Sequence, residues 1–273
     1  MSIFNGKVAI VTGAGSGIGK GLAEELARRG THVVISDINA ERIAAVADGI
    51  VKTNGKVTAS TLDVSKYDAV KKNIDDTVAA YGRIDFIFNN AGIGIAGPAK
   101  DFSIDDWRKV IDINLYGVVY GASIAFPIMM KQGFGHIINT ASIEGLVPMP
   151  STVSYAASKY GVVGLTNALR IEGADYGVKV SAVCPAYIKT AIFNDSKMIN
   201  IDRQKLLAQL PDWIGITPEE CANVILRGVE RNKAFIVVTL LAKFIWALHR
   251  ISPNFVIWIM KIAWRDAKKK GVF

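Results

Sequence analysis

The chain has 273 residues, of which 51% are hydrophobic, and carries a formal net charge of +8. This length fits one α/β domain, which can reach roughly 250 residues, followed by a C-terminal extension, and the core needs no metal or disulfide. The positive charge does not indicate nucleic-acid binding. Residues 240–273 hold a net +6, the rest of the chain only +2, and no basic stripe interleaved with aromatic residues crosses the body.

The two cysteines, Cys184 and Cys221, lie far apart in the sequence and form no CxxC motif. With only three histidines beside them, they predict that no zinc is bound, and two lone thiols are typical of a reducing compartment. The first residues lack a basic segment followed by a long apolar core and a cleavage site, so we expect no signal peptide. We therefore expect a cytoplasmic protein without a bound metal.

Short apolar runs alternate with longer helix-like stretches. The runs are apolar at successive positions, as strands covered by helices on both faces should be. The predicted strands span residues 7–12, 32–37, 56–62, 84–88, 136–140, 178–184 and 235–238. The predicted helices span residues 18–29, 40–53, 67–81, 104–132, 153–176 and 218–231.

Several residues predict where these helices begin and end. Asn39 is a candidate cap, Gly30 a candidate stop, and Pro218 follows Thr217 at a first helical turn. The stretch 104–132 is expected to hold two helices broken near Asn114. The alternation as a whole predicts a Rossmann-type, doubly wound parallel sheet of α/β class with helices on both faces. Its ligand crevice is expected at the carboxyl ends of the strands.

A glycine-rich turn follows the first predicted strand. Only glycines let the backbone approach a pyrophosphate this closely, and the free N–H groups of the following helix would point at the phosphates. The spacing is Gly-x3-Gly-x-Gly and differs from the more common Gly-x-Gly-x2-Gly, so an ordinary strand–helix turn is the alternative for this motif alone. The residues expected to contact a dinucleotide here are Gly13, Ser16, Gly17, Ile18 and Gly19.

Asp37 ends the second predicted strand, 20 residues after Gly17. A carboxylate at this place accepts hydrogen bonds from the adenosine ribose and would repel a 2′-phosphate, which favours NAD over NADP. Arg42 is the one residue that would soften this preference, and a solvated helix charge is its favoured alternative. Two further strand ends carry candidate cofactor contacts, with structural turns as their alternative: Asp63 and Val64 after the third strand, and Asn90, Ala91 and Gly92 after the fourth.

Tyr155 and Lys159 are four residues apart, which places both on one face of a predicted helix. A phenol has a pKa near 10, too high for a base at neutral pH. A neighbouring ammonium and the positive nicotinamide of an oxidised cofactor would favour the phenolate. Such a tyrosine can take a proton from an alcohol or return one to a carbonyl.

Ser142 follows the fifth predicted strand, where its hydroxyl could stabilise charge on a substrate oxygen, and a turn cap is the alternative. Asn114 lies at the predicted helix break, where a freed backbone carbonyl could hold a water beside Lys159. A helix-kink residue is the alternative for Asn114.

These motifs occur together in one chain order, and in that combination the sequence resembles the short-chain dehydrogenase/reductase family over about residues 5–240. The resemblance implies a sheet of about seven strands, and homodimers or homotetramers paired through the helix before Tyr155 and the helix that contains it. It also implies a catalytic set of four residues, in which Lys159 holds the nicotinamide ribose as well: Asn114, Ser142, Tyr155 and Lys159.

The resemblance extends to the loop after the sixth strand, where Thr190 is similar to the residue that binds the nicotinamide carboxamide. Pro185 and Ile188 are cofactor contacts on the same basis. The family commonly has Pro-Gly where this sequence has Pro185-Ala186. We expect this departure to alter the fit of the nicotinamide loop and not the activity.

The remaining segments suggest the substrate and a surface. Within the domain of residues 1–240, the loop at about 186–215 is expected to cover the substrate, and its apolar content, with Val147 and Met149, favours a hydrophobic alcohol or ketone. Packing on the core is the alternative. Residues 241–273 are expected to form an amphipathic helical extension that does not span a membrane, because charged residues interrupt every apolar run. Peripheral membrane contact, subunit contact and a substrate lid are its three alternatives.

The sequence therefore predicts an oxidoreductase that transfers a hydride between NAD and the carbinol or carbonyl carbon of a small hydrophobic molecule. Tyr155 is its predicted general acid and base. The alternative is a non-catalytic, NAD-responsive binding protein associated with a membrane or a partner. That alternative would tolerate substitution of Ser142, Tyr155 and Lys159.

Overall fold

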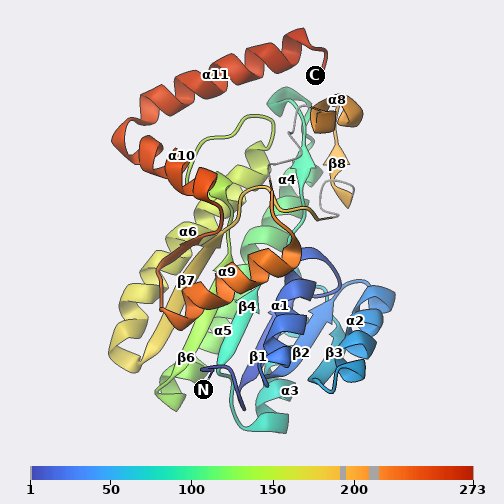
Figure 1. The fold of residues 1–273 in the computed structure, drawn as a ribbon, viewed down its shortest axis with the longest axis vertical. Coiled ribbons are helices and arrows are strands. Elements are labelled where there is room, and N and C mark those ends of the chain that lie inside the picture. The colour runs from blue at the N-terminus through green and yellow to red at the C-terminus, as the bar shows by residue number, and fades with distance from the viewer. Residues whose placement is uncertain (1, 191–194, 209–214, 273) are drawn as a thin grey trace.

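Seven parallel strands form one sheet in the order β3-β2-β1-β4-β6-β7-β9 (Figure 1). The computed structural model describes residues 2–190, 195–208 and 215–272. Strand order runs outward from β1 in one direction and from β4 in the other, so the predicted doubly wound α/β fold is confirmed. The strands are β1 (Val8–Thr12), β2 (His32–Asp37), β3 (Lys56–Thr61), β4 (Phe86–Asn89), β6 (Gly135–Thr140), β7 (Val178–Cys184) and β9 (Phe235–Val237).

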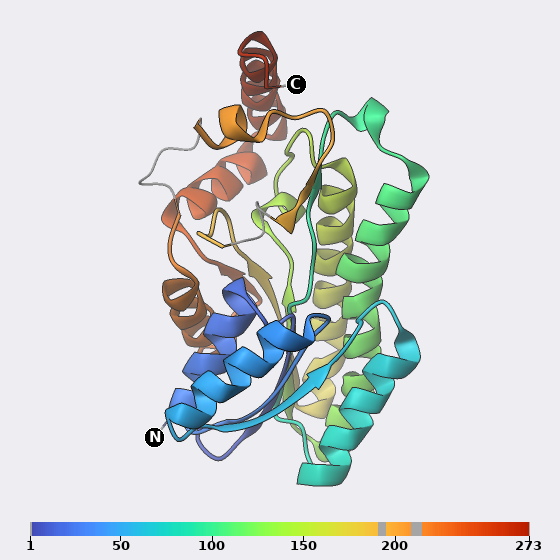
Figure 2. The same ribbon diagram turned by 90° about the vertical axis from the view of Figure 1, so that its right-hand side faces the viewer.

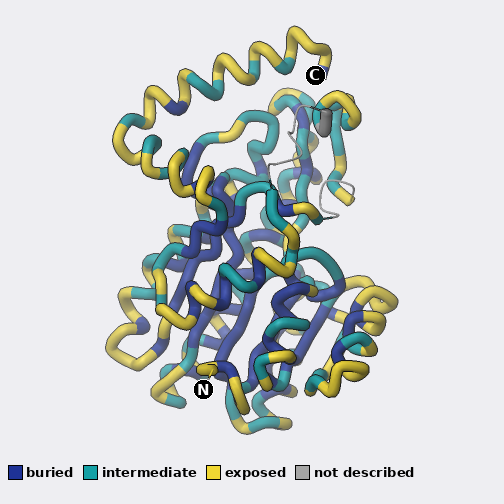
Figure 3. Tube along the Cα trace, viewed as in Figure 1, coloured by how far each residue is buried: buried dark blue, intermediate teal, exposed yellow. Residues whose placement is uncertain are grey.

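Side chains on the inner strands alternate between two buried layers. Ala9 and Val11 of β1 lie in one hydrophobic cluster, and Val8 and Ile10 lie in the other. This is the period of two expected of a strand, with both faces apolar because helices cover both. Figure 3 shows the inner strands as the most deeply buried part of the molecule, while the edge strand β3 is largely exposed.

Helices cover both faces of the sheet: α1, α2 and α9 lie on one side, and α3, α5 and α6 on the other (Figures 1 and 2). The Asn39 side chain accepts a hydrogen bond from Arg42 N at 2.8 Å and caps α2 as predicted. Thr217 forms a capping box with Glu220 at the start of α9. The bounds of these and the adjoining helix are α1 (Gly17–Arg28), α2 (Ala40–Lys52), α3 (Tyr67–Tyr81), α4 (Ile104–Ile111), α5 (Gly117–Gln132), α6 (Val153–Gly173) and α9 (Pro218–Glu230).

The predicted break near Asn114 is a π-helical turn, Asp112–Tyr116, which joins α4 to α5. The chain is therefore helical throughout Ile104–Gln132, with one widened turn in place of an interruption. By length and hydropathy this run is the one helix among the described residues that could cross a membrane. In this fold it is a core helix, because Ala122, Ala125 and Met129 are fully buried.

A small second sheet, which the sequence did not predict, ties the substrate segment to the body. Strand β5 (Ile95–Ala96) pairs in parallel with β8 (Lys197–Met198). The short helix α8 (Arg203–Ala208) follows. Residues 191–194 and 209–214 of the predicted substrate loop lie outside the described residues.

The C-terminal extension consists of α10 (Leu240–Ile251) and α11 (Pro253–Lys269). Ala242 is buried and Ile245 and Trp246 pack with it against the third hydrophobic cluster, which attaches α10 to the body. Helix α11 lies across the end of the molecule opposite the N-terminus and is mostly exposed (Figures 1 and 3). Its distal end is held near α8, where Asp202 N donates to Val272 O at 3.0 Å.

Candidate active site

The glycine turn after β1 packs closely against the loop after β4. Gly13 has φ +66°, and a Cβ at this position would lie 2.7 Å from Ala91 Cα. A Cβ on Gly19 would lie 2.1 Å from Gly13 O. A side chain at either position would clash with the neighbouring backbone. The turn can therefore adopt this conformation, with its backbone along the cleft, only with glycine at both positions.

Asp37 lies where the sequence predicts, at the end of β2 and beside this turn. Its carboxylate accepts hydrogen bonds from Gly15 N and Asn39 N, both at 2.9 Å. Arg42 is close to Asp37 and forms an ion pair with Asp195 at 3.0 Å. Arg42 is therefore not simply a solvated helix charge, because a segment 153 residues away in the chain supplies a carboxylate partner.

Hydrogen bonds also fix the loop after β4. Asn90 Nδ2 donates to Thr12 O at 3.1 Å, and Asn90 N donates to Thr12 Oγ1 at 3.0 Å. Thr140 Oγ1 at the end of β6 donates to Asn90 Oδ1 at 3.2 Å. The carboxyl ends of β1, β4 and β6 are thus joined into one rigid edge. Farther along this edge, Asp63 Oδ1 accepts hydrogen bonds from the backbone and the hydroxyl of Ser65.

A cleft of about 290 Å³ lies along this edge of the sheet. It brings together most of the residues that the sequence assigns to a dinucleotide. These are Gly13, Ser16, Gly17, Ile18, Asp37, Asp63, Val64, Asn90, Ala91, Gly92, Tyr155, Lys159, Pro185 and Thr190.

Two predicted contacts do not line the cleft. Gly19 is buried beneath the turn, and the Ile188 side chain packs in the core with 4% of its surface exposed. Val147 is buried too, and of the two residues thought to face substrate only Met149 is exposed. For Val147 the alternative of core packing is the correct one.

Residues that sequence reasoning missed complete the cleft. Some follow a strand directly, and their position at a strand end could have indicated them. Asp195 and Ser196 come from the predicted substrate segment, and no local signal places them here. The missed lining residues are Ile38, Leu62, Ile93, Gly94, Ile113, Thr140, Ala141, Asp195 and Ser196.

Lys159 is fixed in the floor of the cleft. Its Nζ donates to Thr140 O at 2.8 Å and lies 5.4 Å from the centroid of the Tyr155 ring. Burial is the main influence on the ammonium and lowers the pKa of Lys159 to about 8, although Cys184 and Glu144 act in the opposite direction. Burial of the side chain therefore works against the positive charge of the ammonium.

Asn114 is fully buried in the π-helical turn and holds the loop after β4. Its Oδ1 accepts from Ile93 N at 2.8 Å, and its Nδ2 donates to Ile93 O at 2.9 Å. A Cβ on Gly92 would lie 3.2 Å from Asn114 Oδ1 and 3.6 Å from Lys159 Nζ. Asn114 and Lys159 thus both lie beside Gly92, and the water that a freed carbonyl of this turn would hold stays a prediction.

Ser142 begins a short 3-10 turn after β6, and its Oγ accepts from Glu144 N at 3.1 Å. Ser142 can cap this turn and also bind the substrate oxygen, because a hydroxyl that accepts one hydrogen bond can still donate another. Glu144, which the sequence analysis did not select, accepts a hydrogen bond from Thr152 Oγ1 at 2.5 Å. Burial raises the pKa of Glu144 to about 7, and Thr152 and Lys159 reduce the rise.

The Tyr155 phenol has a raised pKa. Burial is the largest cause, the Glu144 carboxylate adds to it, and a hydrogen bond with Ser142 opposes it. Together, the chain's own groups raise the pKa of Tyr155 despite Ser142, which is opposite to the sequence expectation that the Lys159 ammonium makes the phenol more acidic. The positive nicotinamide ring in that expectation is the remaining group that would lower this pKa.

Among the residues that the structure describes, no group of three His, Cys, Asp or Glu side chains could hold a metal ion. Both cysteines are buried free thiols.

A cleft lined by Tyr155 and Lys159 at the switch point of a doubly wound sheet is the arrangement of a Rossmann-type, dinucleotide-binding protein. The family model for short chain dehydrogenases matches residues 7–199. The chain belongs to the short-chain dehydrogenase/reductase family, whose members use a nicotinamide cofactor, and it is an enzyme acting on CH–OH groups.

Named relatives are similar over most of their length. A cyclohexanol dehydrogenase from Acinetobacter sp. (strain SE19) is 39% identical over 237 residues, which cover 85% of this chain and 91% of that protein. A meso-2,3-butanediol dehydrogenase from Serratia marcescens is 38% identical, covering 70% and 75%. A family member from Burkholderia phymatum, solved in complex with NAD, superposes with a TM-score of 0.85 at 29% identity over 93% of this chain and 96% of that one.

Proposed function

We propose that this enzyme uses NAD to oxidise a hydrophobic secondary or long-chain alcohol, or to reduce the corresponding ketone, with Tyr155 as the general acid and base. The observation that carries the proposal is the placement of the Lys159 ammonium over the Tyr155 ring, both lining the cleft, with Lys159 Nζ donating to Thr140 O at 2.8 Å. The relatives named for cyclohexanol and for 2,3-butanediol support the alcohol class.

The residues present fit a nicotinamide dinucleotide. Gly13 lets the turn pack directly against Ala91, where no Cβ would fit, and Gly92 has no side chain between the cleft and the polar ends of Asn114 and Lys159. Thr190 lies next to this turn, because a Cβ on Gly17 would be 3.2 Å from Thr190 Cγ2. When bound, the nicotinamide supplies the acceptor or donor of the hydride.

In the direction of oxidation, the Tyr155 oxygen accepts the proton of the substrate hydroxyl as the hydride leaves the same carbon. Ser142 Oγ donates a hydrogen bond to the substrate oxygen and orients it. Lys159 is held beside the Tyr155 ring, and Asn114 keeps the loop beside Lys159 in place. The positive nicotinamide is the group that would lower the pKa of the phenol. In reduction, Tyr155 returns the proton to the oxygen that the hydride transfer has made negative.

The cofactor preference for NAD is supported by two observations. The Asp37 carboxylate lies beside the glycine turn and would repel a 2′-phosphate. Arg42, the cation that could attract such a phosphate, is already paired with Asp195.

We also propose that the enzyme is cytoplasmic and that its C-terminal extension makes peripheral contact with a membrane. Phe255, Trp258 and Ile262 share one exposed face of α11. Lys261 and Arg265 lie beside this face, which gives the aromatic and cationic pattern of a helix that lies on a lipid surface.

The test is an assay of NADH absorbance with purified protein, NAD and a panel of alicyclic, aliphatic, steroid and retinoid alcohols. We expect turnover on at least one hydrophobic alcohol and a loss of about 10²-fold or more in kcat for Tyr155→Phe. Tyr176→Phe, an exposed tyrosine after α6, is the matched control and should retain full activity. Tight NAD binding without turnover of any alcohol would favour the non-catalytic alternative.

A further inference from the structure

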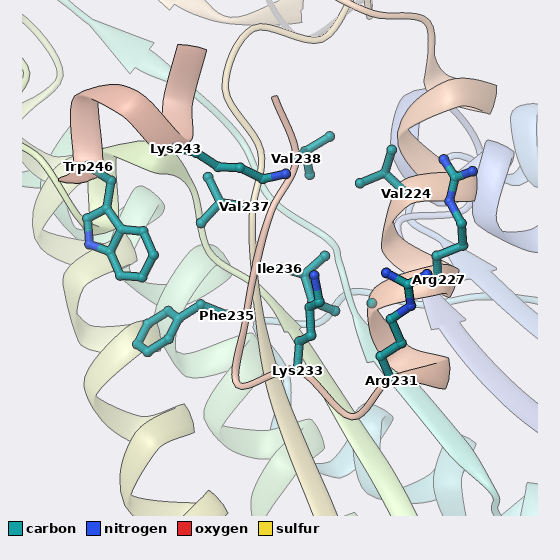
Figure 4. Close-up of a pocket in the computed structure, with 11 residues that line it drawn as sticks. Val224, Arg227, Arg231, Lys233, Phe235, Ile236, Val237, Val238, Lys243 and Trp246 are labelled. Carbon is teal, nitrogen blue, oxygen red and sulfur yellow. The ribbon is translucent and has the colours of Figure 1, made fainter. Parts of the chain in front are cut away.

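A second cleft, of about 340 Å³, lies away from the cofactor site, between α9, β9 and α10 (Figure 4). It shares no lining residue with the cofactor cleft. Its floor is the last strand of the sheet, and its walls come from the helix before that strand and the helix after it. The established family activity gives this cleft no role.

Four cationic side chains line the cleft; in Figure 4 the ends of Lys243, Lys233 and Arg231 face the space between β9 and α9, and the end of Arg227 lies farther along α9. Arg227 and Arg231 are one turn apart at the end of α9, Lys233 follows in the loop, and Lys243 comes from α10. Among the described residues, none of the four forms an ion pair with a carboxylate. The nearest acid in the sequence, Glu230, is paired with Arg29 at 2.9 Å.

The arrangement leaves positive charge uncompensated in one place. Like charges in a confined cleft repel each other, and a bound anion removes that repulsion. Two guanidinium groups and two ammonium groups offer many N–H donors and no acceptor, which is the donor set that binds phosphate. All four side chains are exposed, so an anion can reach them from solvent.

The floor of the cleft is apolar. Phe235 and Trp246 contact each other with ring centroids 5.3 Å apart, and the Arg250 guanidinium lies over the Trp246 ring, 5.5 Å from its centroid. Gly228 lets the strand approach α9, because a Cβ there would lie 2.7 Å from the Ile236 side chain. A ligand for this cleft therefore combines a phosphate with an apolar body.

Lys243 belongs both to this cleft and to the outer face of α10. Leu240, Phe244 and Ile251 recur at helical spacing on that face, with 82%, 67% and 83% of their side-chain surface exposed. Lys243 and Arg250, seven residues apart, flank the same face. The cationic cleft is thus continuous with an exposed apolar stripe.

We propose that the cleft binds the phosphate headgroup of an anionic phospholipid, while the exposed stripe of α10 contacts the acyl region. This inference rests on the proposed membrane contact of the C-terminal extension and assigns that contact a specific headgroup site. The shared chemistry is a phosphate on an apolar body, and the charge of the cleft selects anionic over zwitterionic lipid.

The experiment is sedimentation of the full chain with vesicles of phosphatidylcholine alone or mixed with phosphatidylglycerol. We expect binding to the anionic vesicles, and binding about tenfold to hundredfold weaker for the triple variant Arg227→Gln/Arg231→Gln/Lys233→Gln. The matched control Lys52→Gln/Lys66→Gln/Lys131→Gln removes three exposed cations elsewhere and should bind nearly as well. Equal losses in the two triple variants would overturn the headgroup site.

A third variant separates this site from the membrane contact itself. Phe244→Ser/Trp258→Ser removes exposed apolar contacts and leaves the cleft cations in place. If it alone abolishes vesicle binding while the cleft variant binds normally, the membrane contact holds and the headgroup site fails. If inorganic phosphate raises the Tm of the wild type and not of the cleft variant, while vesicles do not bind, the ligand is a soluble phosphate compound and the lipid assignment is overturned.

Discussion

At the scale of single residues, Glu144 distinguishes this site from the one that the sequence predicts. Its carboxyl group influences both Tyr155 and Lys159, and its own pKa of about 7 lies within the working range of most enzymes. The charge on Glu144 opposes ionisation of the phenol and favours the ammonium. The protonation state of one carboxyl group is thus linked to that of the two residues proposed to move the proton.

Glu144 gives a prediction about stability. Its pKa in the folded chain is raised above the ordinary 4.5, so the folded protein keeps a proton that the unfolded chain releases. The free energy of unfolding should therefore fall as the pH rises from about 4.5 to about 7, by up to about 3 kcal/mol. Glu144→Gln removes this titration. We expect urea unfolding to show the variant gaining stability over wild type from pH 5 to pH 8, and no such gain for Glu172→Gln, an exposed glutamate on α6.

Asp37 gives a prediction about the cofactor. Asp37→Asn removes the negative charge that would repel a 2′-phosphate. The Asp37 carboxylate accepts hydrogen bonds from two backbone N–H groups, and the one oxygen of the asparagine amide can still accept one of them. We expect the ratio of kcat/KM for NAD to that for NADP to fall by about tenfold, as for the loss of a hydrogen bond to a charged group. Asp48→Asn, on the exposed side of α2, should leave the ratio unchanged. An unchanged ratio in Asp37→Asn would place the NAD preference elsewhere.

At the scale of elements, the π-helical turn at Asp112–Tyr116 connects a helix to the active site. π-turns occur mostly as single turns inside α-helices and often at functional sites. Here the turn holds Asn114, which satisfies both backbone groups of Ile93. The loop after β4, which lines the cofactor cleft, is fixed from the helix by that one side chain.

Asn114→Ala should therefore cost more than a surface substitution. It leaves the N–H and the C=O of Ile93 without their partner, and we expect a loss of about 1–3 kcal/mol in the free energy of unfolding together with weaker NAD binding. Urea unfolding and fluorescence titration with NADH measure the two effects. Ser123→Ala, on the exposed side of α5, is the control. Wild-type stability and affinity in the Asn114 variant would contradict this role.

At the scale of the whole molecule, α6 presents one exposed face of small and apolar residues. Ala157, Tyr160, Gly164, Ala168 and Ile171 recur at helical spacing, and Ile171 has 77% of its surface exposed. Small residues on a helix let a second helix approach closely. This face supports the predicted pairing of subunits through the tyrosine-bearing helix.

We expect light scattering after gel filtration to show a dimer or a tetramer. Ile171→Glu should place a charge in the interface and shift the mass toward the monomer. Val51→Glu, on α2, introduces the same charge on an exposed apolar residue elsewhere and should leave the mass unchanged. A wild-type monomer would refute the prediction.

Much of the fold could be predicted from the sequence because it depends on local patterns. Strands such as Val178–Cys184 are apolar on both faces, and parallel strands bring their carboxyl ends to one edge, which collects Asp37, Asn90 and Ser142. The Arg42–Asp195 pair and the cleft of Figure 4 depend on contacts between distant segments. The proximity of Glu144 to Tyr155 could not be predicted either, because the sequence around a turn glutamate does not show whether its side chain faces solvent or the active site.

The attachment of the chain's distal end to α8 has a practical consequence. Asp202 N donates to Val272 O, and Val272 is almost fully buried. A purification tag appended after this end would begin beside the segment expected to cover the substrate, and beside α11. The opposite terminus lies at the far end of the molecule (Figure 1). Recombinant protein for kinetic or vesicle assays is therefore best fused at its amino end.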